Sequence, residues 1–325
     1  MEKEVNYIFC DPQEYRFYWQ ELNYVRNLVD IGVSTDNIYI LNIKKNEDYA
    51  QNIVNHFPGV HLFEFEDKRD RSGKQYAATL KPWLMWQFFE FFPNKKDDVF
   101  FYTDSDIILN KKIEIPDGLD SQHWYGSDCN SYLGVEYING KNYPGSNLLS
   151  EMTSSIGLDE SWVISHDDGS IGAQYLMTGL SATYWKDVYE SSISLKKYLD
   201  SIESRYTKKY KKYNLNIENP VQKWCAEMWA TLWAMGKHGI TPIISDDLKF
   251  CWIDWKISDW TSGKYSIMHD AGVTSSDNGI FYKYDYANKD IFKDMPNLLN
   301  RLDKEKCGYA YALELNKTGK RIKAI

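Results

Sequence analysis

Apolar and polar positions alternate in short blocks through the first hundred residues. Apolar runs typical of strands occupy residues 5–10, 37–44 and 60–66, and a fourth run leads into residues 98–106. Helical spacing is predicted for residues 14–32, 47–59 and 75–93, where Gly32 and Pro93 end the first and last of these helices. Strands and helices in regular alternation predict an α/β fold with a mostly parallel sheet and helices on both faces.

The second half of the chain has a less regular pattern. Strands are predicted at residues 123–128, 179–186 and 240–245, and helices at 186–213 and 219–239. Asn219 is expected to cap the last helix and Pro220 to lie in its first turn. No linker or internal repeat divides the chain.

The fourth apolar run, VFFYTDSDIIL, contains two carboxylates, Asp104 and Asp106. An unpaired buried charge costs several kcal/mol, so we expect a lysine or arginine, a metal ion or the open end of a sheet at this place. Ligands of parallel α/β sheets bind beyond the carboxyl ends of the strands, and these residues stand where the fourth strand is predicted to end.

If Asp104 and Asp106 bind a metal ion, His269 in the segment SIMHDAG is the candidate for its third ligand. It follows a short apolar run and precedes a turn of small residues. Two carboxylates and an imidazole suit Mn²⁺ or Mg²⁺ and leave coordination positions for diphosphate oxygens and water. The alternative for His269 alone is an ordinary loop histidine whose hydrogen bonds are satisfied.

The net charge of −8 argues against general attraction to nucleic acid or to anionic membranes, but a local basic surface remains compatible with it. The segment SRYTKKYKKYN, residues 204–214, interleaves lysines with tyrosines. This segment could contact an anionic polymer such as DNA, or it is a solvated helix face. Its lysines are Lys208, Lys209, Lys211 and Lys212. The 12 Trp, 25 Tyr and 14 Phe either fill the core or offer flat faces for sugars and bases.

The five cysteines are widely separated and form no C-x-x-C pair, which indicates neither a zinc site nor a disulfide framework. The first residues lack an apolar stretch long enough for a signal peptide, and no segment has the length and hydropathy of a membrane span. We therefore expect a reduced, cytoplasmic protein without a membrane partner.

The strand-borne DSD, the preceding helix YAATLKPWLMWQFFEFFP and the late histidine resemble GT-A nucleotide-sugar glycosyltransferases. The wider pattern LKPW…VFFYTDSDII…GAQYLMTG…AEMWATLWAMG…MHDAG is similar to transferases that glycosylate peptidyl serine or hydroxyproline, and to their phage-encoded relatives. The resemblance spans roughly residues 5–272, and it places the protein in the host cytoplasm if it is phage-encoded. It implies a GT-A, Rossmann-like fold with an irregular acceptor-side half, and a metal-dependent hexosyl- or pentosyltransferase.

The resemblance also implies a division of the chain. Residues 1–112 would form the nucleotide-sugar-binding half, residues 113–285 the acceptor-side half of the same domain, and residues 286–325 a C-terminal extension.

The resemblance assigns roles at the donor. Asp106 would bind the metal, Asp104 the metal or the ribose, and His269 would complete the coordination. Ser105 would lie against the nucleotide, and Tyr76 would belong to the donor site. Lys81 either reaches the diphosphate or is a solvated helix lysine.

Four further residues are candidates for the sugar and the acceptor. Asp168 and Gln174 lie in the polar stretch SHDDGSIGAQYLMTG, which either meets sugar hydroxyls or is a simple Asx-rich turn. Glu227 lies among tryptophans on a predicted helix, where a carboxylate could act as a general base, or is a surface glutamate. Asp128 is a second candidate base or sugar ligand.

The predicted function is transfer of a sugar from a nucleotide-diphosphate donor to a hydroxyl. The acceptor is a protein or glycan hydroxyl, or a hydroxymethylated pyrimidine in phage DNA. Two other functions remain open: a metal-dependent nucleotidyltransferase or phosphohydrolase, and a non-catalytic carbohydrate- or nucleic-acid-binding protein.

Overall fold

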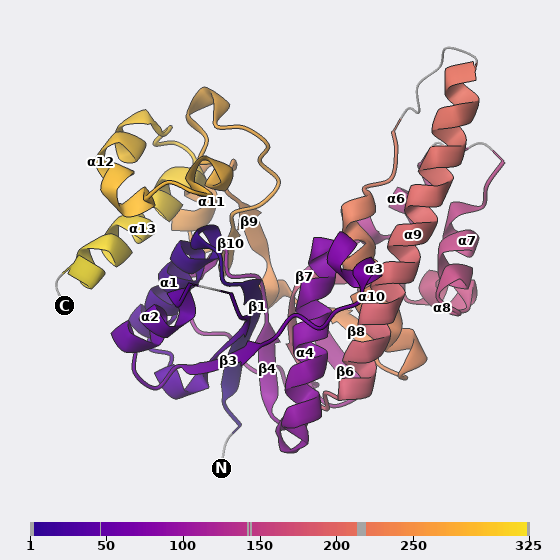
Figure 1. Ribbon diagram of the computed structural model, residues 1–325, viewed down its shortest axis with the longest axis horizontal. Coiled ribbons are helices and arrows are strands. Elements are labelled where there is room, and N and C mark those ends of the chain that lie inside the picture. Colours follow the sequence, from indigo (N-terminus) through magenta and orange to yellow (C-terminus); the bar gives the residue numbers. More distant parts are fainter. Residues whose placement is uncertain (1–2, 46, 142, 144, 213–218, 324–325) are drawn as a thin grey trace. The chain divides into compact units, whose positions relative to one another are not determined.

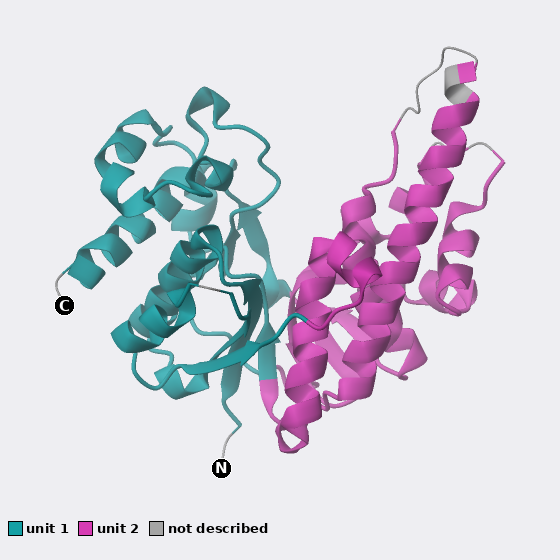
Figure 2. Cartoon of the chain, viewed as in Figure 1, with its two compact units in different colours: residues 1–67, 100–115, 246–325 teal, residues 68–99, 116–245 magenta. Residues whose placement is uncertain are grey.

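The computed structural model describes residues 3–45, 47–141, 143, 145–212 and 219–323, without the side chains of residues 210 and 211. Lys211 of the lysine-rich segment therefore lies outside the described side chains. The chain divides into two compact units (Figure 2). Unit 1 comprises residues 1–67, 100–115 and 246–325, and unit 2 comprises residues 68–99 and 116–245.

Strand and helix alternate through the first stretch of unit 1, as the hydrophobic pattern predicts (Figure 1). This stretch contains β1 (Val5–Pro12), α1 (Tyr15–Asp30), β2 (Ile38–Ile43), α2 (Tyr49–His56) and β3 (His61–Phe65). The remainder adds β5 (Ile107–Leu109), β9 (Phe250–Trp252), α11 (Ile257–Thr261), β10 (Ile267–His269), α12 (Ile291–Arg301) and α13 (Cys307–Lys323). Helix α1 packs against α2 and α13, and α13 packs against α11 and α12.

The main sheet has seven strands in the order β3-β2-β1-β4-β7-β6-β8, where β4 is Val99–Tyr102, β6 is His123–Asp128, β7 is Ile171–Met177 and β8 is Thr241–Ile244. Strands β1, β2 and β3 pair in parallel, and β6 pairs in parallel with β8. Strand β7 runs antiparallel to β6. The predicted α/β class with a mostly parallel sheet is confirmed.

A second sheet of three short strands, in the order β5-β10-β9, lies in unit 1. Strand β10 runs antiparallel to β5 and parallel to β9, and His269 stands opposite Ile107 on one side and Trp252 on the other. All three residues of β5 and all three of β10 are buried. This register holds His269 beside Asp106, the residue that precedes β5, although the two are far apart in sequence.

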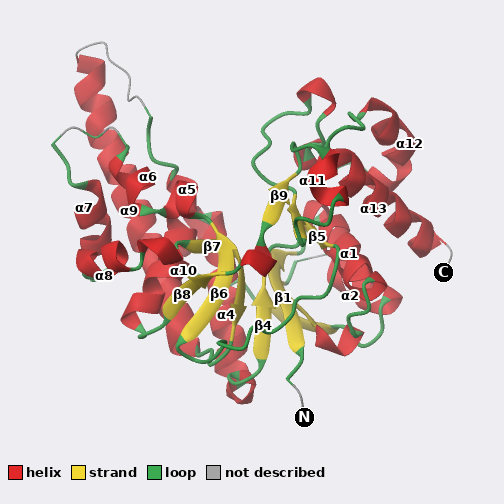
Figure 3. Cartoon of the chain, turned by 180° about the vertical axis from the view of Figure 1, so that it is seen from behind, coloured by secondary structure: helices red, strands yellow, loops and turns green. Residues whose placement is uncertain are grey.

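Unit 2 is mostly helical (Figure 3). Its helices are α3 (Arg71–Gln75), α4 (Leu80–Phe91), α5 (Asn130–Leu133), α6 (Val135–Asn139), α7 (Leu148–Ser155), α8 (Glu160–Ser165), α9 (Ala182–Lys212) and α10 (Ala226–Lys237). Helix α9 packs against α4 and α10. Trp185, Trp229 and Trp233 are fully buried, so these tryptophans form core rather than a stacking surface. Among the described residues, no helix combines the length and the apolar character that crossing a membrane would need.

Three predicted elements of the second half are wrong in place or type. Residues 179–186 are not a strand, because α9 begins at Ala182 after Gly179, which has a positive φ of 72°. The strand lies earlier, at β7, within the segment predicted to be a polar loop. The helix predicted from residue 219 begins at Ala226, and Asn219 has a φ of 50° instead of capping it.

Candidate metal centre

Asp104 and Asp106 come after β4, separated from it by Thr103, and lie in the turn that leads into β5. Ser105 between them is buried, with 2% of its surface exposed. The Asp106 side chain is buried, whereas that of Asp104 is about one third exposed, at 32%. The apolar residues on either side, which form β4 and β5, bury the backbone and leave the carboxylates at the strand ends.

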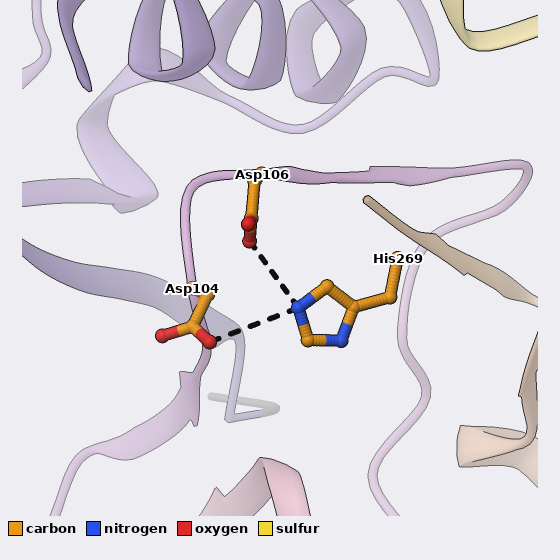
Figure 4. A group of neighbouring side chains, drawn as sticks. All are labelled: Asp104, Asp106 and His269. Atoms are coloured by element: carbon orange, nitrogen blue, oxygen red, sulfur yellow. Dashed lines mark ion pairs between the residues drawn. The ribbon is translucent and has the colours of Figure 1, made fainter. Parts of the chain in front are cut away.

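The two carboxylates converge on one imidazole (Figure 4). The Nε2 atom of His269 lies 3.3 Å from Asp106 Oδ1 and 3.7 Å from Asp104 Oδ2. One ligand atom from each of the three residues lies within 4.8 Å of the other two. Metal–oxygen distances are about 2.0–2.6 Å, so two ligand atoms of one divalent ion lie no more than about 5 Å apart. The three atoms meet this limit.

The orientation of His269 is fixed by its strand and by an aromatic neighbour. Its ring stacks on Trp252 with centroids 5.5 Å apart and planes at 22°. The residue is 5% exposed and forms the end of β10. The backbone N–H of the next residue, Asp270, donates to the carbonyl oxygen of Asp106 at 2.9 Å. Ring stacking and this backbone hydrogen bond together hold the imidazole toward the two carboxylates.

Lys283 is the lysine that was one of the three groups expected beside the buried carboxylates, although the sequence did not identify which lysine it would be. Its ammonium donates to Asp106 Oδ2 and, at 2.5 Å, to the carbonyl oxygen of Asp270. Burial alone would raise the pKa of Asp106, but Lys283 and then His269 outweigh burial and hold that pKa well below its usual range. Burial likewise opposes the charge on Lys283, yet Asp106 and Asp270 raise its pKa. Burial raises the pKa of the Asp270 carboxyl to about 8.

The residues present fit a hard divalent cation. The donor set of two carboxylates and one imidazole is one that Mn²⁺ and Mg²⁺ accept. The Oδ1 atom of Asp106 is buried, faces the imidazole and makes no hydrogen bond of regular geometry with any described residue. A buried carboxylate oxygen in this state is available for coordination.

Lys81, Glu227 and Tyr76 come together in unit 2. The Lys81 ammonium lies 3.6 Å from Glu227 Oε2, and Thr231 Oγ1 donates to Glu227 Oε1 at 3.2 Å. The backbone N–H of Glu227 donates to the Tyr76 hydroxyl at 3.0 Å, and burial, followed by the Glu227 charge, raises the pKa of Tyr76. Glu227 is 4% exposed and lies in the first turn of α10, where the helix dipole favours an acidic residue.

The other sequence candidates lie on β6, on β7 and in the turn before β7. Gln174 is fully buried on β7, and its Oε1 accepts a hydrogen bond from Ser127 at 2.6 Å. Asp128 is exposed at the end of β6 and accepts from the backbone N–H of Asn130. Asp168 is exposed in the turn at residues 167–169. A buried amide in a strand is placed to support the sheet, whereas the two aspartates are open to solvent.

Sequence reasoning missed Lys283, Asp270 and Trp252. Asp270 and Trp252 could have been suspected, since one adjoins His269 and the other lies in an aromatic run. Nothing local marks Lys283, which lies 14 positions beyond His269 in a segment without strand or long-helix periodicity.

No protein-family model and no curated protein matches this chain. Solved structures similar to it include the bifunctional glycosyltransferase WbbM, with a TM-score of 0.47 at 10% identity over 98% of this chain. They also include the galactosyltransferase LgtC in complex with donor and acceptor sugar analogues, with a TM-score of 0.41 at 8% identity over 87% of this chain and 94% of that one. The glycosyltransferase GlyE of Streptococcus pneumoniae TIGR4 has a TM-score of 0.38 at 12% identity over 99% of this chain and 64% of its own. The chain spans about half, 52%, of the length of the WbbM chain.

Proposed function

We propose that the protein is a glycosyltransferase of the GT-A type that uses Mn²⁺ or Mg²⁺ and a nucleotide-diphosphate sugar. The observation that carries the proposal is the convergence of Asp104, Asp106 and His269 at the end of β4. This placement is where α/β sheets of parallel strands bind their ligands.

A divalent ion held at this centre would offset the negative charge that develops on the departing nucleoside diphosphate. The residues of the chain would hold and orient that ion. Asp106, buried and fixed by Lys283, would be the anchor, and the more exposed Asp104 would face the donor. Trp252 would keep the imidazole of His269 in place.

The first test measures release of nucleoside diphosphate from a panel of nucleotide sugars in the presence of Mn²⁺. We expect slow release that EDTA stops and that Asp106→Asn and His269→Ala each reduce by at least about 100-fold, since one lost electrostatic contact in a reaction centre costs about that much. Asp277→Asn, a change at an exposed aspartate in unit 1, is the matched control and should leave the rate unchanged.

The products separate the candidate functions. Release of nucleoside monophosphate or pyrophosphate would favour the nucleotidyltransferase or phosphohydrolase. Carbohydrate binding without turnover would favour a non-catalytic binding protein. Full activity in EDTA, or in either variant, would contradict the metal centre.

For the acceptor step we propose Glu227 or Asp128 as the general base, which makes the reaction inverting. Activity should then fall at acidic pH as the carboxylate gains a proton. Glu227→Gln or Asp128→Asn should lower the rate of transfer by about 100-fold or more. Loss in neither variant, with a retained anomeric configuration in the product by NMR, would instead favour a retaining path in which Gln174 lines the sugar.

The proposed acceptor is a hydroxyl of a protein, a glycan or a hydroxymethylated pyrimidine in DNA. DNA would be held by the lysines of residues 208–212, so replacement of Lys208, Lys209, Lys211 and Lys212 by alanine should weaken DNA binding and flatten its salt dependence. Donor hydrolysis should be spared. An unmodified nucleoside digest after incubation with hydroxymethylated DNA and several donors would remove DNA from the acceptors.

A further inference from the structure

Lys283 is a buried ammonium placed against a proposed metal ligand. Its side chain is 15% exposed and lies at the start of a short 3-10 helix, Lys283–Tyr286. Both of its described contacts, Asp106 Oδ2 and the Asp270 carbonyl, are acceptors within the metal centre. Burying an ammonium is costly unless a carboxylate compensates it, so Lys283 and Asp106 depend on each other.

The two oxygens of Asp106 are used differently. Oδ2 accepts from the Lys283 ammonium, while Oδ1 faces His269 Nε2 at 3.3 Å without a regular hydrogen bond. The carboxylate therefore has the ammonium as its cation on one side and faces the His269 imidazole on the other. An ion that binds through Oδ1 must enter a site that already contains a cation.

We propose that Lys283 is a resident cation of the centre, which keeps Asp106 compensated in the metal-free protein and lowers the affinity for a divalent ion. The inference rests on the metal centre of the proposed function. If the ammonium stays when the ion binds, the two cations repel each other across a few ångströms of buried protein. If the ammonium withdraws, its ion pair with Asp106 is lost. In both cases the ion binds more weakly than its three ligands alone would allow.

The first arm of the test needs no metal. In EDTA, Lys283→Met should lower Tm by several degrees, because Asp106 becomes a buried carboxylate without its cation. In an Asp106→Asn background the same substitution should lower Tm much less, since the side chain at position 106 then has no charge to compensate. Equal losses of Tm in both backgrounds would overturn the proposed mutual dependence.

The second arm measures Mn²⁺ binding by the electron paramagnetic resonance signal of the free ion, without any donor. Lys283→Met should bind Mn²⁺ at least about tenfold more tightly than the unmodified protein, and Lys283→Arg, which keeps the charge, should not. Lys289→Met removes an exposed lysine that pairs with Asp294, and it is the matched control. If the Met variant does not fold in EDTA, Lys283→Gln replaces it.

The outcomes distinguish this inference from the proposed function. Unchanged or weaker Mn²⁺ binding in Lys283→Met, with normal binding by the unmodified protein, would overturn the resident cation and leave the metal centre intact. Absence of Mn²⁺ binding in every form at millimolar concentration would overturn the metal centre and this inference with it.

Discussion

Glu21 on α1 is a carboxylate whose pKa gives a clear prediction. The residue is 1% exposed, and burial, followed by the nearby charge of Asp11, raises its pKa well above 4.5. A raised carboxyl pKa contributes stability at low pH, below the unfolded-state pKa, and that stability is lost as the pH rises toward the folded-state pKa. We therefore expect Glu21→Gln to be neutral near pH 4 and to stabilise the protein by more than about 1 kcal/mol at pH 7.5.

Urea unfolding at the two pH values measures this difference. Glu66→Gln, at an exposed position, is the control and should change stability equally at both. A stabilisation by Glu21→Gln that does not grow between pH 4 and pH 7.5 would refute the assigned cause.

Single residues differ in how well the sequence predicts them. Asp104, Asp106 and His269 could be predicted because each interrupts or ends an apolar run, and a charge at such a position needs a reason. The sequence suggests separate roles for Lys81 and Glu227, yet the two side chains form an ion pair. Nothing in the sequence reports that pairing, since it depends on how α4 and the start of α10 meet.

Arg26 joins two helices of unit 1 that lie at opposite ends of the chain. From α1, where it is 2% exposed, it donates to Glu314 Oε2 at 2.6 Å and to Thr318 Oγ1 at 3.0 Å, both on α13. It also pairs with Asp30 at 2.6 Å. Arg26→Met should lower the free energy of unfolding by about 2–4 kcal/mol, because it removes a buried cation with its hydrogen bonds and leaves Glu314 and Asp30 only the more exposed cations of Lys317 and Arg321.

Arg321 on α13 provides a matched comparison for that substitution. It pairs with the same Asp30 at 3.0 Å but is 39% exposed. Arg321→Met should lower the free energy of unfolding by less than about 1 kcal/mol, because exposed ion pairs contribute little to stability. If urea unfolding shows similar losses of unfolding free energy for both variants, burial is not what makes the Arg26 contacts stabilising.

Elements with a clear period were predictable, and those whose local preference opposes their environment were not. The first five strands and helices, from β1 to β3, follow from spacing to within a few residues at their ends, whereas the helix expected at residues 75–93 is α4, which begins at Leu80. Residues 183–185, Thr-Tyr-Trp, favour a strand by propensity, yet they form the first turns of α9 because Ser181 Oγ accepts from the Tyr184 N–H and both aromatic rings are buried. Strand β7 is hard to predict because Gly169 and Gly172 resemble loop glycines. Gly172 lies within the strand, at a place where a Cβ atom would come too close to Cys129 and Leu133.

At the scale of the whole molecule, the metal centre belongs to unit 1 alone. All three candidate ligands lie in residues 100–115 and 246–325 of that unit. We expect Mn²⁺ to slow amide hydrogen exchange in peptides covering residues 104–109 and 265–270, because a common ion would hold these two segments together.

Helix α10 in unit 2 is the internal reference for this exchange measurement, and its rates should not change. The Asp106→Asn protein should show no response to the ion in either segment. Protection of α10 equal to that of the two unit 1 segments would mean that the ion binds elsewhere.

Unit 1 is discontinuous in sequence, so its parts are synthesised at different times. Its first stretch ends at residue 67 and its last begins at residue 246, so all of unit 2 leaves the ribosome in between. At about 5–20 residues per second this interval lasts about 10–40 s. Throughout that time β1, β2 and β3 are synthesised but β9, β10 and the helices from α11 onward are not. The nascent chain therefore presents an incomplete apolar core to the cell, and the first-made part of the protein is the last to be finished.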